Sequence, residues 1–427
     1  MGVTLPRACL LLVAIVRGVW PAPQVSPEMT LMNQARQRMA ANLASLPNYT
    51  CLEAIDRSVR RPAKQKLLFR DRIHLEVAFI EANEMFSWPG AGSFESDLLE
   101  QIPQVGASGA GGFGGWTRTL FGPSTPDFTY AGECMVDGRR GSKYTFRVPA
   151  KSSTYEVRSA GGIAMSPYSG SVCIDPGSLD IMLLEIITGQ TPPPVASISE
   201  SIHYGRARIG SADFLLPRDH ELVVTDLEGN ENRNLTSFTS CREYASQSSI
   251  SFDMEHAAAS GPQVKVEEVQ IPPGVSMDLK LETPITFEES AVGDPITARF
   301  DRAIKAPGVS VPKGAIVSGR IRGLEQYFDP EKYFLVSLEF SSLTFDSKHA
   351  KFRAILLGPR LQAERHLDSS GMATETDVST PGSAHSEPSG FDIDTSSPRF
   401  GVFRVRGGSL RLSRGLRMIW QTESETP

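Results

Sequence analysis

From residue 48 onward, apolar side chains recur at every second position, and this period decides the fold class. Between residues 73 and 79 the odd positions, from Ile73 to Phe79, are apolar, while Arg72, His74 and Glu76 alternate with them. A period of two places successive side chains on opposite faces of a β-strand. The chain also has 30 prolines and 37 glycines, which fits many short strands separated by turns. We therefore predict a mainly β protein.

One helix precedes the strands. Ser26 followed by Pro27 is typical of a helix start, and Pro47 ends the pattern. Such a helix has one apolar face and needs a surface to lie on. We predict an N-terminal helix on a curved antiparallel sheet, which forms a half-barrel. The apolar positions of the helix are three or four residues apart: Met32, Ala35, Met39, Leu43 and Leu46.

The chain length predicts two domains. Its 427 residues exceed the size of one typical core. The first domain spans residues 26–253, and a linker follows at residues 254–270. Residues 271–427 are predicted to form a small β-barrel or sandwich. Within it, residues 367–399 are rich in small and polar residues, so we predict a disordered insertion there.

Residues 1–25 are predicted to be a signal peptide. Arg7 precedes nine apolar residues at positions 8–16, which suits a secretory segment and is too short to span a bilayer. A buried N-terminal strand or a misplaced start are the alternatives. No later segment has 18 uninterrupted apolar residues, so no transmembrane span is predicted. We expect an exported protein of the periplasm or cell envelope.

Four cysteines follow the predicted signal, at Cys51, Cys134, Cys173 and Cys241. An even number in an exported chain indicates two disulfides, with four isolated thiols as the alternative. Cys51 opens the first domain on a strand-like segment and Cys241 closes it on another. We therefore predict that these two pair, which leaves Cys134 with Cys173.

No local motif predicts catalytic residues, a cofactor or a metal. Residues 109–114 match GxGxxG, but a proline-bearing loop precedes them and we expect no helix after them, so a dinucleotide site is not supported. The seven histidines are scattered, without HxH or HExxH. A net charge of −6 argues against a nucleic-acid partner. The basic turn predicted at residues 57–66 either contacts anionic lipid or glycan, or is a solvated hairpin tip.

The apolar face of the early strands is the candidate ligand site. One helix, about 10 Å wide, covers only part of such a face, so the remainder is either a cavity or a core that loops plug. Leu120 and Phe121, beside Trp116 and just past a glycine-rich loop, are the candidate plug or lid. The alternative is that these side chains are ordinary core. The candidate ligand-binding residues are Leu75, Val77, Phe79, Phe86, Trp88 and Trp116.

Two parts of the chain resemble known families. Residues 27–250 contain a helix, a basic hairpin, a long meander and an Asp175-Pro-Gly turn between strands. This order resembles the periplasmic lipoprotein-carrier fold of the LolA and RseB type, which implies a curved antiparallel sheet around an apolar concavity. Residues 275–322 contain Val292-Gly-Asp-Pro-Ile-Thr and the stretch Val311 to Gly319. They resemble the β-barrel domain of TrbI-type conjugation proteins, in which a Pro-Lys-Gly turn joins two strands.

The chain as a whole resembles exported bacterial proteins that join two such modules. The leading hypothesis is a non-catalytic binding or scaffold protein of the cell envelope, which holds an apolar ligand, such as a lipid or lipoprotein, or a protein partner. Two alternatives stay open. One is a secreted hydrolase with a dispersed active site, and the other is a purely structural surface protein.

Overall fold

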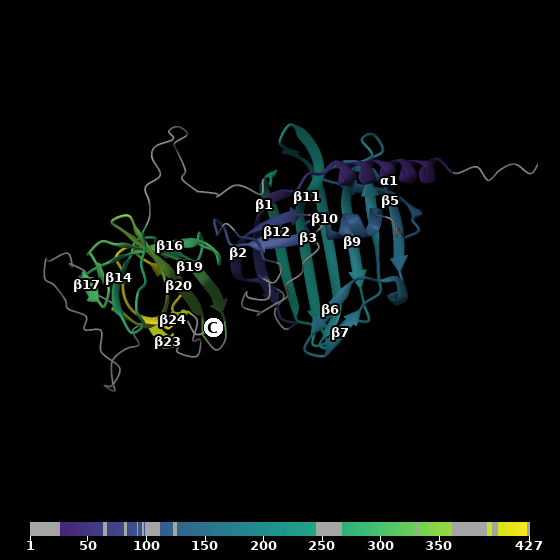
Figure 1. The fold of residues 1–427 in the computed structure, drawn as a ribbon. Helices are drawn as coiled ribbons and strands as arrows, with labels where there is room; N and C mark the ends of the chain where they lie inside the picture. Colours follow the sequence, from purple (N-terminus) through teal and green to yellow (C-terminus); the bar gives the residue numbers. More distant parts are fainter. Residues whose placement is uncertain are drawn as a thin grey trace, which may run out of the picture.

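The protein is mainly β, as predicted, and forms two units that lie side by side (Figure 1). The predicted signal peptide, most of the glycine-rich loop and most of the linker lie outside the part of the chain that this computed structural model describes. Among the described residues, no helix is both long and apolar enough to cross a bilayer. The described residues are 26–62, 66–80, 83–91, 93–95, 98, 112–122, 126–244, 267–328, 331–360, 391–394 and 400–424.

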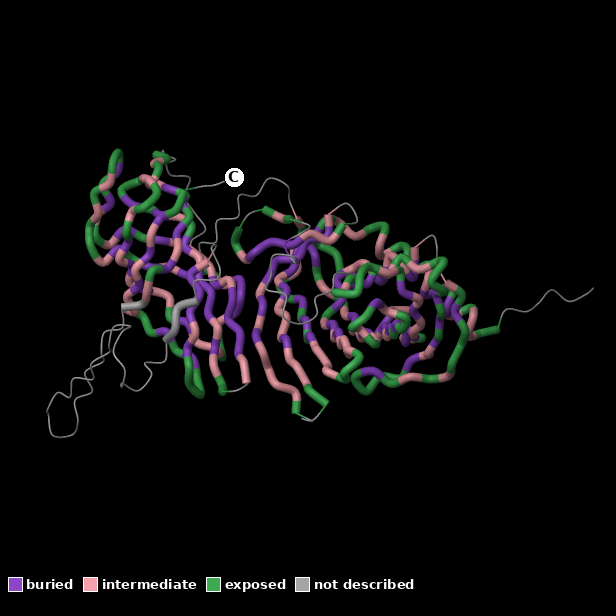
Figure 2. Tube along the Cα trace, turned by 90° about the horizontal axis from the view of Figure 1, so that it is seen from below, coloured by how far each residue is buried: buried purple, intermediate pink, exposed green. Residues whose placement is uncertain are grey.

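The N-terminal unit is built on one antiparallel sheet of ten strands in the order β3-β2-β1-β12-β11-β10-β9-β8-β5-β4. The sheet curls strongly into a half-barrel, seen in the view from below in Figure 2. In sequence order its first strand, β1, pairs with its last, β12, which brings sequence-distant segments together inside the sheet. The strands are β1 (Tyr49–Arg60), β2 (Leu68–Ile80), β3 (Asn83–Ser87), β4 (Thr129–Val136), β5 (Arg139–Val148), β8 (Tyr168–Ile174), β9 (Ile181–Thr188), β10 (Val195–Ile209), β11 (Ala212–Asp226) and β12 (Glu231–Glu243).

The predicted N-terminal helix is α1 (Pro27–Ser45), which lies along one side of the sheet (Figure 1). The Ser26 side chain caps it and accepts a hydrogen bond from the Met29 amide at 3.3 Å. Asn42 holds it to β11 through both the carbonyl and the amide of Leu215, at 3.1 and 3.0 Å. The helix buries Met32, Ala35 and Met39, three of its predicted apolar positions.

Two smaller elements complete the unit. The hairpin of β6 (Glu156–Ser159) and β7 (Gly162–Met165) projects at the end opposite α1, after a short 3-10 turn at Ala150–Ser152. A helix of seven residues, α3 (Gly115–Phe121), follows the glycine-rich loop. We expected no helix there, so this prediction is wrong. A two-turn segment between glycines carries too few residues for the helical period to be recognised.

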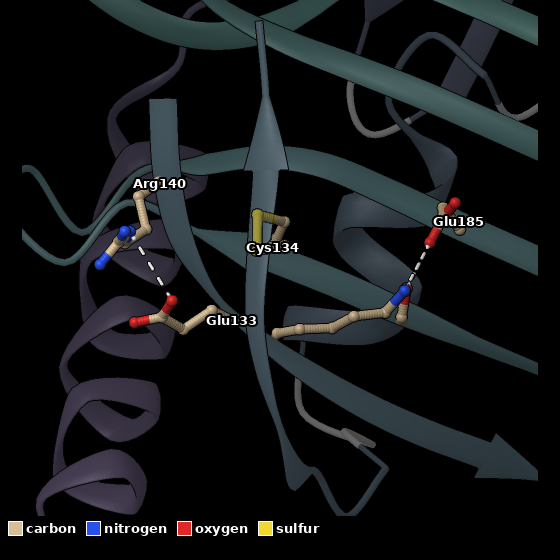
Figure 3. Close-up of a disulfide and its surroundings, with 7 residues drawn as sticks. Glu133, Cys134, Arg140 and Glu185 are labelled. Carbon is tan, nitrogen blue, oxygen red and sulfur yellow. Dashed lines mark hydrogen bonds and ion pairs between the residues drawn. A yellow bond between two sulfur atoms is a disulfide. The ribbon is translucent and has the colours of Figure 1, made fainter. Parts of the chain in front are cut away.

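Two disulfides join strands of the N-terminal unit. Cys51 on β1 bonds to Cys241 on β12, and Cys134 on β4 bonds to Cys173 on β8. The first bridge spans 190 residues of sequence and the second spans 39. Figure 3 shows Cys134 beside the exposed ion pair of Arg140 with Glu133, whose N–O distance is 3.6 Å.

The C-terminal unit is a second mainly antiparallel sheet, in which β20 pairs along one part with β21 and along another with β24. Most of its buried side chains are apolar. A Cβ at Gly401 on β24 would lie 2.4 Å from the Trp420 ring on β26, so these unpaired strands face each other across the core. The strands are β13 (Glu267–Glu268), β14 (Ser276–Leu281), β15 (Ile285–Thr286), β16 (Pro295–Phe300), β17 (Ile304–Ala306), β18 (Val309–Val311), β19 (Ile316–Tyr327), β20 (Tyr333–Phe345), β21 (Lys348–Lys351), β22 (Arg353–Arg360), β23 (Phe391–Asp394), β24 (Gly401–Arg406), β25 (Arg411–Leu412) and β26 (Arg417–Glu423).

The two units share a backbone contact. The His74 amide on β2 donates to the Val292 carbonyl at 2.8 Å, and the Val292 amide donates to the Arg72 carbonyl at 2.9 Å. The next residue, Gly293, has a φ of +100°, and a Cβ there would lie 2.3 Å from the His74 carbonyl oxygen. Only glycine fits this turn. The Val292-Gly-Asp sequence noted above therefore forms a contact with the first unit.

Three expectations about chain segments need correction. β1 continues through Arg60, so Arg57 lies within a strand; its side chain is buried and bonds to Asp71. Residues 267–268, placed in the linker, form β13, and residues 391–394, placed in the disordered insertion, form β23. In each case pairing with a neighbouring strand determines the structure, and sequence composition does not reveal that pairing. The rest of the insertion lies outside the described residues.

Candidate ligand-binding site

Strand register decides which side chains share the inner face of the curled sheet. One row across it runs from Ile73 on β2 through Ile55, Thr236, His220 and Ile202 to Leu184 on β9. A neighbouring row contains Asn234, Leu222, Glu200 and Ile186. This second row continues through Arg57 on β1 to Asp71 on β2. Polar side chains therefore occupy the middle of the first row, with apolar side chains on either side, and reach β2 in the second.

The structure brings most of the predicted ligand-binding residues together. Leu75, Val77, Phe79 and Phe86 are buried in one cluster with Phe113. Trp116 belongs to a second cluster, where its ring stacks on Tyr155 and meets Tyr168 edge-on, with centroid distances of 5.1 Å to each.

Trp88 faces the C-terminal unit instead. Its ring lies 5.0 Å from the guanidinium carbon of Arg322 on β19. It also lies next to Gly293. The six predicted residues therefore do not form one surface.

Helix α3 covers the inner face. Its Trp116, Leu120 and Phe121 side chains are all buried and pack in the same cluster as α1. A helix of seven residues is not stable alone, so packing and polar contacts hold it in place. A pocket of about 880 Å³ beside α3 is lined by residues that include Arg118, Val148 and Tyr168.

Glu200 accepts hydrogen bonds from three side chains at the centre of the inner face. The indole Nε1 of Trp116 donates to Oε2 at 2.8 Å, the Tyr155 hydroxyl donates to Oε1 at 2.8 Å, and Nε2 of His220 lies 3.0 Å from Oε2. Complete burial works to raise the pKa of Glu200, but the bond and charge of His220, with the other donors, outweigh it and hold this pKa below its usual range. Glu200 is therefore ionised.

The segment before α3 packs against the hydrogen-bonded side chains around Glu200. A Cβ on Gly112 would lie 2.2 Å from Nδ1 of His220, so only glycine permits the backbone to approach this closely. The amides of Gly114 and Gly115 both donate to Oε1 of Glu84, at 2.9 and 3.0 Å. The Trp116 indole and the amides of Gly114 and Gly115 therefore all donate hydrogen bonds to carboxylates of the sheet.

Glu53 is another carboxylate on the inner face, and it is 9% exposed. In the register it lies between Leu75 on β2 and Phe238 on β12. Burial, and then the charge of Glu84, raise the pKa of Glu53 to about 8. Among the described residues, its Oε2 atom has no hydrogen-bond partner.

The sequence analysis did not identify Glu53, Glu200 or His220. The sequence pattern could have revealed the first two, because each carboxylate occupies a position where the alternation predicts an apolar residue. Glu53 lies between Cys51 and Ile55, and Glu200 lies between Ile198 and Ile202. A charged residue at an inward position of a strand needs a partner, but the sequence does not name that partner.

The polar side chains at the centre of the inner face bond to one another. In the described part of the chain, the imidazole of His220 bonds to Glu200 and to no serine or cysteine. Nor do three or more His, Cys, Asp or Glu side chains gather as a metal site within the described ranges. The site is a set of buried hydrogen-bond acceptors between two apolar surfaces.

No family model matches the sequence, and no curated protein matches it. Among solved structures, a DUF1329 family protein from Desulfovibrio piger is 14% identical, with a TM-score of 0.26 over 52% of this chain and 96% of its own. A domain named for outer membrane lipoprotein sorting, from Vibrio parahaemolyticus, is 9% identical, with a TM-score of 0.25 over 51% of this chain and 93% of its own. At TM-scores this low, neither structure establishes a shared family or function.

Proposed function

We propose that this chain is an exported binding protein, and that its N-terminal unit holds an apolar ligand such as an acyl chain. The observation that carries the proposal is α3, a separate short helix that covers the inner face of the sheet with buried apolar side chains. If α3 moves away, the ligand would contact the apolar floor that Trp116, Leu120 and Phe121 now cover. A lipoprotein or another envelope protein is the partner class that such a ligand implies.

Two further observations support the proposal. The pocket beside α3 includes Tyr168, which also contacts Trp116, so it offers a route from solvent to the covered face. The two disulfides support export, because such bonds persist in oxidising compartments and are rare in the cytosol.

Binding of a neutral hydrophobic dye tests the proposal. Nile red should bind the native full-length protein saturably, and Trp116→Ala should bind it more tightly because the variant removes the largest side chain of the cover. Trp420→Phe is the matched control, since Trp420 is buried in the C-terminal unit. If folded wild-type protein and folded Trp116→Ala both fail to bind the dye, the proposal is wrong.

A second candidate is a purely structural role. One continuous core includes residues of both units, from Tyr49 and Leu75 in the first to Phe340 and Trp420 in the second. A shared core favours a rigid scaffold. Native mass spectrometry of protein purified from its own envelope separates the candidates, because a scaffold would carry no co-purified small molecule.

A further inference from the structure

The segment that covers the inner face, α3 with the glycines before it, is held to the sheet by hydrogen bonds that it donates. Trp116 donates from its indole to Glu200, and two consecutive backbone amides donate to Glu84. The acceptors are carboxylates of β10 and β3, and both lie on the inner side of the curled sheet. A ligand that displaces α3 therefore removes three donors from two carboxylates.

A buried acceptor that loses its donor makes binding less favourable, and the loss is largest when the acceptor is charged. A site built to hydrogen-bond a donor rejects an analogue that lacks one. A plain hydrocarbon or an ester would leave the buried Glu200 without the donor that Trp116 now supplies. A carboxylate head would add a like charge, which is also unfavourable in a buried site.

Glu53 adds an independent observation. More than nine-tenths of its surface is buried on the same inner face, and among the described residues its Oε2 atom has no partner. Phe113, from the segment just before α3, packs against Tyr49 and Phe238, at 5.0 Å in each case. Phe238 on β12 lies directly opposite Glu53, and Tyr49 lies four residues before it on β1. The surface around this atom is thus one that the covering segment occupies but does not satisfy.

The cations near these carboxylates differ in their partners, and the buried Nε atom of Arg118 has no hydrogen-bond partner among the described residues. His220 is bonded to Glu200, and the guanidinium of Arg118 lies over the Phe79 ring at 4.4 Å. Arg57 is bonded to Asp71. The inner face therefore combines apolar walls with acceptors that an incoming group must satisfy.

We propose that the site selects amphiphiles whose head group donates hydrogen bonds and carries no negative charge, such as a long-chain amine or alcohol. The apolar tail would replace Leu120 and Phe121, and the head would replace the Trp116 N–H at Glu200. This inference rests on the proposed function and specifies its ligand class.

The test compares four probes with the same twelve-carbon chain, below their micelle concentrations, by displacement of Nile red from the full-length protein. Dodecylamine should bind most tightly, followed by dodecanol, methyl dodecanoate and dodecanoate. A hydrogen bond to a charged group predicts an advantage of about tenfold or more for the amine over the ester.

Glutamine variants of single glutamates test whether the preference for the amine arises at the inner face. Glu200→Gln should reduce the advantage of the amine about tenfold. Glu185→Gln is the matched control, because Glu185 lies on the neighbouring strand β9 with its side chain on the outer face, bonded to Ser171 and Lys143. If Glu200→Gln does not fold, Glu53→Gln replaces it. This variant should lose the gain in amine affinity that the wild type shows between about pH 7 and pH 9, where Glu53 ionises.

The outcomes separate the two proposals. If all four probes bind equally, or if dodecanoate binds as tightly as dodecylamine, the selectivity is wrong while the apolar site stands. An amine preference that is unchanged in Glu200→Gln also overturns it. If that variant does not fold, a gain in amine affinity between about pH 7 and pH 9 that is unchanged in Glu53→Gln overturns it instead. If none of the probes displaces the dye, the proposed function fails, and the selectivity fails with it.

Discussion

The interiors of the two units are built differently. The part of the shared core that lies in the C-terminal unit is built from apolar side chains of strands, among them Phe300, Phe340 and Trp420, each no more than 1% exposed. The N-terminal sheet has carboxylates and a histidine at the centre of its inner face, and a separate helix covers them. Apolar and polar side chains alternate along the strands of both sheets. The β structure alone therefore does not explain why charged side chains lie at the centre of the inner face of the first sheet.

This difference indicates where function lies. An apolar core made by the strands themselves is closely packed and stable, and it contains no separate segment that a ligand could replace. Buried carboxylates cost stability unless they are satisfied. Here one of the three side chains bonded to Glu200, Trp116, belongs to a seven-residue helix that has little stability of its own. The first interior is therefore expected to respond to disulfide loss, pH and ligands, and the second to core truncation alone.

Removal of the long disulfide should have the largest effect. The double variant Cys51→Ser with Cys241→Ser frees a segment of 190 residues, which in the chain-entropy treatment lowers the free energy of unfolding by up to about 5 kcal/mol. Hydrogen exchange should show faster exchange in β1 and β12, with β14 and β26 still protected. Equal loss of protection in both units would show that their stabilities are not separable.

Truncation in the second interior should come next. Trp420 is fully buried and meets Phe340 edge-on at 5.1 Å. Trp420→Ala should lower the free energy of unfolding by about 3–5 kcal/mol, because it leaves a large cavity. Chemical denaturation measures this change. The variant that remains folded should bind Nile red as the wild type does, and weaker binding would link the C-terminal core to the ligand site.

The pH dependence of stability should distinguish the first interior. The pKa of Glu53 is about 8 in the folded protein and has an ordinary value near 4.5 when the chain is unfolded. Between these values the folded protein holds a proton that the unfolded chain has released. The free energy of unfolding should therefore fall as pH rises, by up to about 1.4 kcal/mol per pH unit.

Glu53→Gln should remove this slope, since glutamine does not titrate. Denaturation series from about pH 5 to pH 8 for both proteins provide the comparison, and the difference between them cancels the contribution of the histidines. Parallel curves would contradict the burial of a neutral Glu53.

The smallest effect is expected on the outer face of the first sheet. Glu185 accepts from Ser171 and, as the labelled carboxylate in Figure 3, from Lys143, at 2.7 and 3.2 Å. Its side chain is 45% exposed, so Glu185→Gln should change the free energy of unfolding by less than about 1 kcal/mol. Glu200→Gln, one strand away and buried, should cost more. If both variants lowered the free energy of unfolding equally, the two faces of the sheet would not differ as proposed.

Several features of the fold could be predicted from local sequence. The alternation after residue 48 predicted the strands, and the spacing of Met32, Ala35 and Met39 predicted the buried face of α1. The positions of Cys51 and Cys241 at the two ends of the first unit predicted a bridge that the structure contains. These features depend on nearby residues or on order along the chain, which a sequence records directly.

The candidate site was predicted only in part. Phe79 and Phe86 were assigned to the inner face because alternation fixes the side of a strand on which a residue lies. Trp88 was assigned to the same face, but it contacts the C-terminal unit, because alternation does not say which neighbour covers a face. The helix that contains Trp116 was missed altogether.

The sequence by itself therefore determined the fold class, the first helix and which residues could be buried. Only the tertiary structure decided that Glu200 of β10, His220 of β11 and Trp116 of α3 meet, and that Val292 pairs with β2. The physical reason is strand register. Alternation fixes the face of each residue within one strand, whereas its neighbours on other strands depend on how far each strand is shifted along the next, and that shift is set by the packing of the whole sheet.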